Sequence, residues 1–288
     1  MNVEDLTARL SPRFGPEVAV WCADVPVRAG ALAERWALTL GVPYDDGASS
    51  VAIRCTTSDG TPAVLKLTPD DAFLAEQVVM LRSLAPSGRV VGVLAAEHGA
   101  VLLEAVVPGV EAEPSPEEWA DLMTALHAVP PPPGLERTLR GRMEESFARI
   151  SRRLVEPAIA AHVDRAVWDL TVQRCGRLLD TGSTPVLLHG DLHPGNVLDG
   201  GTRGLVAIDP KTCVGDACFD AVDYVVDAAG KGSVEERCAR VAAAYGLDPE
   251  RLRAWARVDA PLLAIGYLTW GGPAGAVEEL LAFAAGQG

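Results

Sequence analysis

The sequence predicts an α+β protein in which a small N-terminal β-sheet with one helix precedes a larger, mostly helical part. Short runs of apolar and β-branched residues, separated by turn signals, fall mainly within residues 36–106. Helical periodicity with capping signals dominates from residue 115 onward. Because 288 residues can bury more than one core, we divide the chain into an N-terminal lobe, residues 1–105, and a C-terminal lobe, residues 106–288.

The N-terminal lobe is expected to combine strands with helices. Residues 4–12 and 27–35 have the apolar spacing of amphipathic helices, and residues 70–84 form a third helix with acidic residues in its first turn. Strand-like runs occupy residues 36–40, 50–55, 63–67, 90–95 and 100–106. The polar segment 58–61 is typical of a hairpin turn, so two of these strands are expected to be antiparallel.

The C-terminal lobe is expected to be helical around one β-rich segment, residues 185–209. Ser115 caps a helix that has acidic residues in its first turn and ends near His127. Further helical patterns cover residues 136–155, residues 158–180 and the chain from about residue 219 onward.

The charge balance excludes several classes of partner. The chain has 25 basic and 39 acidic residues and a formal net charge of −14, so general binding to DNA, RNA or an anionic membrane surface is not expected. A cationic ligand would suit this charge. The alternative is that the acidity only keeps the protein in solution.

Neither a secretory signal nor a membrane span is predicted. The first ten residues lack a basic region followed by an apolar stretch. The longest uncharged run, residues 260–277, is interrupted by glycine and proline. None of the six cysteines belongs to a CxxC motif, so buried thiols in a reducing cytoplasm are expected rather than zinc ligands.

The chemistry-bearing residues are concentrated in the segment PVLLHGDLHPGNVL, residues 185–198. An apolar run ends there in a loop with Asp191 and Asn196, and a second apolar run, LVAI, ends at Asp209. Two strands joined by a short turn would bring these side chains to one rim. One aspartate can accept a hydroxyl proton, while the asparagine and the other aspartate offer the hard oxygen ligands that Mg²⁺ prefers. The pattern therefore indicates phosphoryl transfer.

Phosphoryl transfer also needs a cation that contacts the phosphates of the nucleotide. Lys66 lies at the end of a predicted strand, and Glu76 follows ten residues later in the next predicted helix. The order Lys66, Glu76, Asp191, Asn196 and Asp209 is the one that a kinase-like fold requires.

Residues 36–225 resemble the aminoglycoside phosphotransferases, relatives of the eukaryotic-type protein kinases. The motifs that carry the resemblance are VLKL, LHAVPPPPGL, HGDLHPGN, AIDP and GDACFD, in chain order. The proline-rich motif is typical of the streptomycin 6-phosphotransferase and hydroxyurea phosphotransferase subgroup. The resemblance implies a bilobal protein-kinase-like fold, with a small N-terminal lobe of antiparallel sheet plus helix, a larger mostly helical C-terminal lobe, and ATP in the cleft between them.

The resemblance also assigns roles to individual residues. Asp191 would be the catalytic base, or the group that orients the acceptor hydroxyl. Asn196 and Asp209 would hold Mg²⁺. Lys66 would contact the α- and β-phosphates of ATP and pair with Glu76.

Four further residues would support the nucleotide and the catalytic loop. Glu104 and Ala105 would offer backbone groups of the inter-lobe hinge to adenine. His189 would pack under the catalytic loop, and Asp220 would brace that loop from the helix behind it.

The glycine-rich loop that protein kinases place over the phosphates is absent from the first hairpin of this sequence. Ser49 and Ser50 are instead the candidates for contacts with the phosphates. A P-loop site is excluded, because no GxxxxGK[ST] motif occurs.

The implied function is ATP-dependent transfer of the γ-phosphoryl group to a hydroxyl of a small cationic molecule. A streptomycin-like aminoglycoside, phosphorylated at its 6-hydroxyl and thereby inactivated as an antibiotic, is the sharpest expectation. The alternatives are a kinase of hydroxyurea or another small hydroxylated compound, and a nucleotide-binding pseudokinase module. A cytoplasmic monomer is expected, with neither nucleic acid nor membrane as partner.

Several residues remain open at this stage. His189, Asp191 and His193 form an HxDxH pattern, which would also be compatible with a metal hydrolase if further ligands existed. Lys211 is expected at the surface and Trp270 in the core. Asp227, Glu278 and Glu279 stand in for the acidic residues of the helical lobe that would bind a cationic acceptor.

Overall fold

The computed structural model describes residues 2–45, 47–182, 184–227, 232–273 and 275–286. The chain divides into two compact units. The N-terminal unit comprises residues 1–86 and 90–109, and the C-terminal unit comprises residues 87–89 and 110–288.

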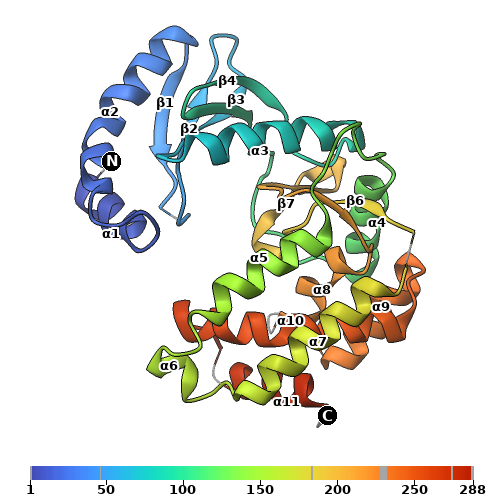
Figure 1. Cartoon of the computed structure of the whole chain (residues 1–288). Helices are drawn as coiled ribbons and strands as arrows, with labels where there is room; N and C mark the ends of the chain where they lie inside the picture. Colours follow the sequence, from blue (N-terminus) through green and yellow to red (C-terminus); the bar gives the residue numbers. More distant parts are fainter. Residues whose placement is uncertain (1, 46, 183, 228–231, 274, 287–288) are drawn as a thin grey trace. The chain divides into compact units, whose positions relative to one another are not determined.

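The N-terminal unit is built on a five-stranded antiparallel sheet (Figure 1). Its strands, in spatial order, are β1 (Thr39–Pro43), β2 (Val51–Thr56), β3 (Pro62–Leu67), β5 (Ala100–Glu104) and β4 (Val93–Glu97). The expected hairpin joins β2 to β3. In its turn, Asp59 accepts hydrogen bonds from the Thr57 hydroxyl and the Thr61 backbone N–H, and Gly60 takes a φ of 87°.

Helices cover both faces of this sheet. Helices α1 (Val3–Phe14) and α2 (Val18–Arg35) share a hydrophobic cluster with Leu65 and Leu67 of β3. Lys66, which lies between these two leucines, hydrogen bonds to helix α3 (Asp71–Leu84). Because successive side chains of a strand point to opposite faces, α3 packs on the face opposite to α1 and α2.

Helix α2 begins earlier than the expected helix at residues 27–35, and it contains Pro26 in its interior. Burial of Val18, Cys22 and Val25 against the sheet outweighs the backbone hydrogen bond that the proline removes. The helix boundary was therefore set by tertiary packing that the local sequence does not reveal.

The C-terminal unit consists mainly of helices. They are α4 (Pro116–His127), α5 (Leu139–Ser151), α6 (Pro157–Ala160), α7 (Arg165–Asp180), α8 (Phe219–Val226), α9 (Val234–Tyr245), α10 (Pro249–Trp270) and α11 (Ala276–Ala285). Helix α10 packs against α7, α8, α9 and α11 (Figure 1). Ser115 and Ser233 form capping boxes at the starts of α4 and α9, which satisfies backbone N–H groups there.

Two small β-ribbons interrupt these helices. Strand β6 (Val186–Leu188) pairs with β9 (Cys213–Gly215), and β7 (Val197–Asp199) pairs with β8 (Leu205–Ala207), both antiparallel. Short 3₁₀ turns, Pro194–Asn196 and Gly201–Arg203, flank β7. All four strands lie in or just beyond the expected β-rich segment.

The cysteines agree with the sequence expectation of buried thiols. All six cysteines are buried free thiols, and burial raises the pKa of Cys175, Cys213 and Cys238 to about 12. Within the described ranges, no helix combines the length and the apolar character needed to cross a membrane.

Candidate active site

The loop after β6 is fixed from below by Asp220 of α8. The Asp220 carboxylate accepts hydrogen bonds from the backbone N–H groups of His189, at 2.7 Å, and Gly190, at 2.9 Å. The Lys211 backbone N–H donates to the His189 carbonyl oxygen at 2.8 Å. These bonds hold the start of the loop from two sides, which is the geometry that the predicted bracing role of Asp220 requires.

Gly190 is required by this geometry. Its φ is +79°, and a Cβ placed on it would lie 2.3 Å from the Lys211 carbonyl oxygen. A larger residue would therefore combine backbone strain with a clash against main-chain atoms.

Asp220 is itself held in its ionised form. Burial opposes ionisation, but the hydrogen bond from His127 and the charges and N–H groups around it prevail and lower its pKa. The second ring nitrogen of His127 lies 2.8 Å from the Tyr245 hydroxyl. His127 is thus part of the support of the loop after β6, a role that its position near a predicted helix end did not reveal.

His189 packs beneath the loop and is fully buried. Its Nε2 lies 3.0 Å from the Ile208 carbonyl oxygen and donates to it. Burial lowers the pKa of His189, so the ring is neutral at physiological pH. A neutral ring that is committed to a carbonyl oxygen serves packing rather than proton transfer.

Asp191 lies between two cationic side chains. Its Oδ1 is 3.0 Å from Arg142 Nη2, and its Oδ2 is 2.7 Å from Lys211 Nζ. Burial would raise the pKa of Asp191, but the charges of Lys211 and then Arg142 outweigh it and lower this pKa. The carboxylate is therefore ionised at neutral pH. The Lys211 side chain is 41% exposed, as expected for a surface position, and its ammonium group nevertheless contacts Asp191.

Asn196 and Asp209 come from adjacent strand ends. The Ile208 backbone N–H donates to the Asn196 carbonyl oxygen at 2.9 Å, next to the β7–β8 pairing. Asp209 has a φ of 55°, a strained conformation that is common at functional sites. Asn196 Nδ2 donates to the Asp191 carbonyl oxygen at 2.9 Å, which leaves Oδ1 as its ligand atom.

This donor set fits a magnesium ion. Among the residues that the structure describes, no group of three or more histidine, cysteine, aspartate or glutamate side chains is arranged to hold a metal. Mg²⁺ does not need one, because it keeps several water ligands and usually binds one or two carboxylates together with phosphates. Asn196 and Asp209 would supply the hard oxygen atoms for that mode, and their binding of Mg²⁺ stays a prediction.

In the N-terminal unit, Lys66 is buried, with 5% exposure, and its ammonium group donates to Gln77 Oε1 at 2.9 Å. The sequence pointed to the neighbouring Glu76 as the partner. Gln77 is the residue of α3 that faces β3, and the Glu76 side chain is exposed. The pairing of Lys66 with Glu76 stays a prediction, whereas Gln77 is a partner that sequence reasoning missed.

The loop before β2 is anchored through its carbonyl groups. The Thr68 hydroxyl donates to the Ser49 carbonyl oxygen at 2.8 Å, and Arg9 donates to the Ser50 carbonyl oxygen at 3.2 Å. Ser50 is buried and Ser49 is half-buried. Contacts of these serines with phosphate stay a prediction.

The two hinge residues use their N–H groups within the N-terminal unit. The Glu104 N–H donates to the Gly92 carbonyl oxygen at 2.9 Å, and the Ala105 N–H donates to the Pro62 carbonyl oxygen at 3.3 Å. Neither N–H is therefore available to adenine in this conformation, so a contact with adenine would have to use their carbonyl groups.

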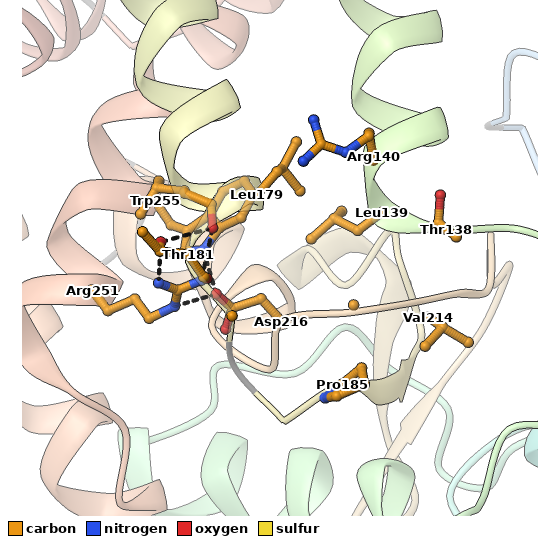
Figure 2. A pocket seen from close by; sticks show the side chains of 13 residues that line it. Thr138, Leu139, Arg140, Leu179, Thr181, Pro185, Val214, Asp216, Arg251 and Trp255 are labelled. Carbon is orange, nitrogen blue, oxygen red and sulfur yellow. Dashed lines mark hydrogen bonds and ion pairs between the residues drawn. The ribbon is translucent and has the colours of Figure 1, made fainter.

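A pocket of about 190 Å³ opens elsewhere in the C-terminal unit, between the ends of α5, α7 and α10 and strand β9 (Figure 2). None of the predicted site residues lines it. Its polar wall includes Thr181, Asp216 and Arg251. Arg251 donates a hydrogen bond to the Thr181 hydroxyl and forms an ion pair with Asp216.

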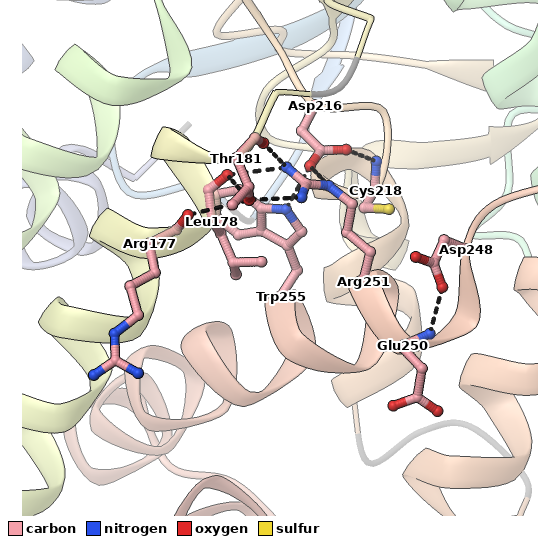
Figure 3. A network of polar contacts seen from close by, with 9 residues as sticks. All are labelled: Arg177, Leu178, Thr181, Asp216, Cys218, Asp248, Glu250, Arg251 and Trp255. Atoms are coloured by element: carbon pink, nitrogen blue, oxygen red, sulfur yellow. Dashed lines mark hydrogen bonds and ion pairs between the residues drawn. The ribbon is translucent and has the colours of Figure 1, made fainter.

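The network on this wall is structural (Figure 3). Arg251 forms an ion pair with Asp216 and donates to the carbonyl oxygens of Leu178, at 3.0 Å, and Thr181, at 2.9 Å. Trp255 Nε1 donates to the same aspartate at 2.8 Å. Asp216 thereby ties the segment that leads into α8, and so to Asp220, to helices α7 and α10.

The three acidic residues that were expected to bind a cationic acceptor come from two separate segments of the chain. Asp227 accepts a hydrogen bond from the Tyr267 hydroxyl at 3.2 Å, while Glu278 and Glu279 are exposed in the first turn of α11. The core position expected for Trp270 is wrong, because this side chain is 81% exposed at the end of α10.

Comparison with known proteins identifies the family. The sequence profile of the family described as aminoglycoside/hydroxyurea antibiotic resistance kinase matches residues 35–269. The chain belongs to this family. The expected resemblance is thereby confirmed, and the chain is a small-molecule kinase that phosphorylates a hydroxyl group.

Relatives of this kinase carry related names. A hydroxyurea phosphotransferase from Kitasatospora aureofaciens is 31% identical over 243 residues, which cover 80% of this chain and 69% of the relative. A streptomycin 6-kinase from Streptomyces glaucescens is 31% identical over 229 residues, covering 75% and 72% of the two chains.

Solved structures confirm the fold. Aminoglycoside 2'-phosphotransferase-IIIa in its GDP complex superposes with a TM-score of 0.61 over 91% of this chain and 98% of that one, at 16% identity. The predicted kinase-like α+β fold is therefore correct. Kinases of this fold use a nucleotide together with a divalent metal ion.

Proposed function

We propose that this kinase transfers the γ-phosphoryl group of ATP, with Mg²⁺, to the 6-hydroxyl of a streptomycin-like aminoglycoside. The N-terminal lobe would bind the nucleotide, and the C-terminal lobe would carry the catalytic residues and the acceptor. The observation that carries the proposal is the loop of Asp191, where an ionised carboxylate, two Mg²⁺-type oxygen donors and the supporting Asp220 come together in a member of this kinase family.

Asp191 would orient the acceptor hydroxyl and accept its proton. Its lowered pKa makes it a weak base, which suits a loose transition state in which positioning matters more than early proton removal. Lys211, in contact with Asp191, would add positive charge where negative charge moves during transfer.

Other residues would hold the nucleotide and its metal ion. Asn196 and Asp209 would bind Mg²⁺, which neutralises phosphate charge when bound. Lys66, held by Gln77, would contact the α- and β-phosphates.

Hydroxyurea is a second candidate acceptor, because the hydroxyurea phosphotransferase is as similar to this chain as the streptomycin 6-kinase. Purified protein, ATP and Mg²⁺ incubated with each compound, followed by mass spectrometry for an added phosphate, distinguishes the two. Acceptor-dependent ADP release that is lost in Asp191→Ala supports the proposal. ATP binding without turnover on any acceptor would instead indicate a pseudokinase module.

A further inference from the structure

Arg142 of α5 reaches the loop of Asp191 from a segment 49 residues away in the sequence. Its Nη2 donates to Asp191 Oδ1 at 3.0 Å, and its side chain is 21% exposed. Lys211 Nζ lies 2.7 Å from the other carboxylate oxygen, but the lysine is the more exposed of the two cations. Lysine carries its charge on a flexible stem, whereas the guanidinium of arginine is a planar, rigid donor. Arg142 is therefore the more rigid of the two groups that contact this carboxylate.

Both ends of the Arg142 side chain are held in place. Thr138, which caps α5, forms a parallel bridge with Val214 of β9 (Figure 2). Strand β9 pairs with β6, which leads into the loop of Asp191. At the charged end, Arg142 Cζ lies 5.9 Å from the centre of the Phe219 ring in the first turn of α8. The guanidinium is thus presented to Asp191 from a fixed direction.

Two further acidic side chains lie within the electrostatic range of Arg142, namely Asp223 of α8 and Asp259 of α10. Burial, and then the charges of Asp259 and Asp191, raise the pKa of Asp223. Burial raises the pKa of Asp259 to about 7, with Arg142 opposing and Asp191 adding to the effect. Burial also acts on Asp191, but the charges of Lys211 and Arg142 outweigh it there and lower the pKa. Asp191 is thus the ionised partner with which Arg142 pairs.

We infer that Arg142 is a positioning residue for phosphoryl transfer, which holds the Asp191 carboxylate in the orientation that receives the acceptor hydroxyl. The inference rests on the proposed function, because it takes Asp191 as the residue that orients this hydroxyl. The terminal torsion of an aspartate side chain is broad. A carboxylate that loses one of its two cationic donors therefore spends less time in the productive orientation. Loss of Arg142 lowers kcat and leaves the KM for ATP unchanged, since ATP binding does not depend on this orientation.

The test compares Arg142→Gln and Arg142→Lys with the wild type. The matched control is Arg140→Gln on the same helix, where the arginine is 45% exposed and pairs with Asp180 at 2.7 Å. ADP release is measured with ATP, Mg²⁺ and streptomycin, and thermal melts verify that each variant is folded.

Arg142→Gln is expected to lower kcat about 10- to 100-fold, as when a reacting group is slightly misplaced. Arg142→Lys keeps a charged donor and should recover part of this loss. The control should have the kcat of the wild type, and the KM for ATP should be the same in all four proteins. A wild-type kcat for Arg142→Gln, or an equal loss in Arg142→Lys, would overturn the inference.

A double variant separates positioning from general loss of structure. Asp191→Ala removes the carboxylate, so adding Arg142→Gln to it should lower kcat by less than about two-fold further. Structural damage that is independent of Asp191 would instead multiply the two losses, and this result also refutes the positioning role.

The outcomes keep this role apart from the proposed function. Streptomycin that gains no phosphate refutes the proposed acceptor, and the same kcat ratios are then measured with hydroxyurea or with water as the phosphoryl acceptor. Phosphorylation of streptomycin at an unchanged rate by Arg142→Gln refutes the positioning role alone. Absence of ADP release with all three acceptors refutes both.

Discussion

The stability of the C-terminal unit is expected to fall between pH 5 and pH 8, and the substitution Asp259→Asn should remove much of this fall. The pKa of Asp259 is raised to about 7 in the folded protein, against 3.8 for the ordinary side chain. Between these two values the folded state binds more protons than the unfolded state, so stability decreases as pH rises and levels off above the folded-state value.

The magnitude follows from the pKa. From pH 5 to a folded-state value of about 7, roughly two pKa units at 1.36 kcal/mol each give about 3 kcal/mol. Asp259 keeps some contact with solvent and shares its proton equilibrium with Asp223, so about half of this, roughly 1.5 kcal/mol, is the lower expectation. For a chain of this size, the range corresponds to roughly 3–10 °C in Tm.

The assay is thermal unfolding of the wild type and Asp259→Asn across this pH range, followed by circular dichroism. The informative quantity is the change with pH, since any packing cost of the asparagine is the same at both ends. The wild type should lose more stability than the variant. The control Asp169→Asn, at an exposed aspartate that pairs with Arg165 at the surface, should follow the wild type. Parallel curves for all three proteins would refute the reasoning, because they would show that Asp259 titrates as an ordinary exposed carboxylate.

Three further predictions concern the catalytic groups. Asp191→Ala should lower kcat at least about 100-fold while ATP binding, measured by calorimetry, is retained; near-normal turnover would remove Asp191 from its role. Gly190→Ala should lower both Tm and kcat, because its Cβ would meet the Lys211 carbonyl oxygen at 2.3 Å, and a variant with wild-type melting and activity would contradict this. Gln77→Leu should raise the KM for ATP several-fold by removing a buried acceptor from Lys66, and a larger effect of Glu76→Gln would make Glu76 the main partner instead.

The strand ends of the catalytic loop could be predicted because their signal is local. Asp191, Asn196 and Asp209 lie where apolar strands end abruptly. Polar side chains at such positions have few structural roles, so a functional role was predicted for them. The fold class followed from the same kind of observation, since strand-like and helical patterns occupy different parts of the chain.

Gln77 was missed as a partner of Lys66 because charge was given more weight than helical position. Adjacent residues of a helix point about 100° apart, so a helix turns one residue of such a pair more directly toward its packed face than the other. Leu74, Gln77 and Leu81 are all buried at the spacing of one helical face. That periodicity was visible in the sequence, and it identifies Gln77.

The remaining site residues lack any local signal. Arg142 and His127 reach the loop of Asp191 from helices that are far apart in the sequence, and nothing in their neighbours distinguishes them from surface or core residues. Lys211 has a side chain that is 41% exposed, which is ordinary for a lysine. Only the tertiary structure shows that its ammonium group ends 2.7 Å from Asp191.

The net charge of −14 says less about the acceptor than the charged side chains around Asp191 do. Charges farther from a bound ligand than about 8 Å are largely screened at physiological ionic strength, so the total says little about the acceptor. Near Asp191 the balance depends on Arg142 and Lys211 against the carboxylates of Asp191, Asp223 and Asp259. The charge around Asp191 is thus set by a few nearby side chains, and the total of −14 does not describe it.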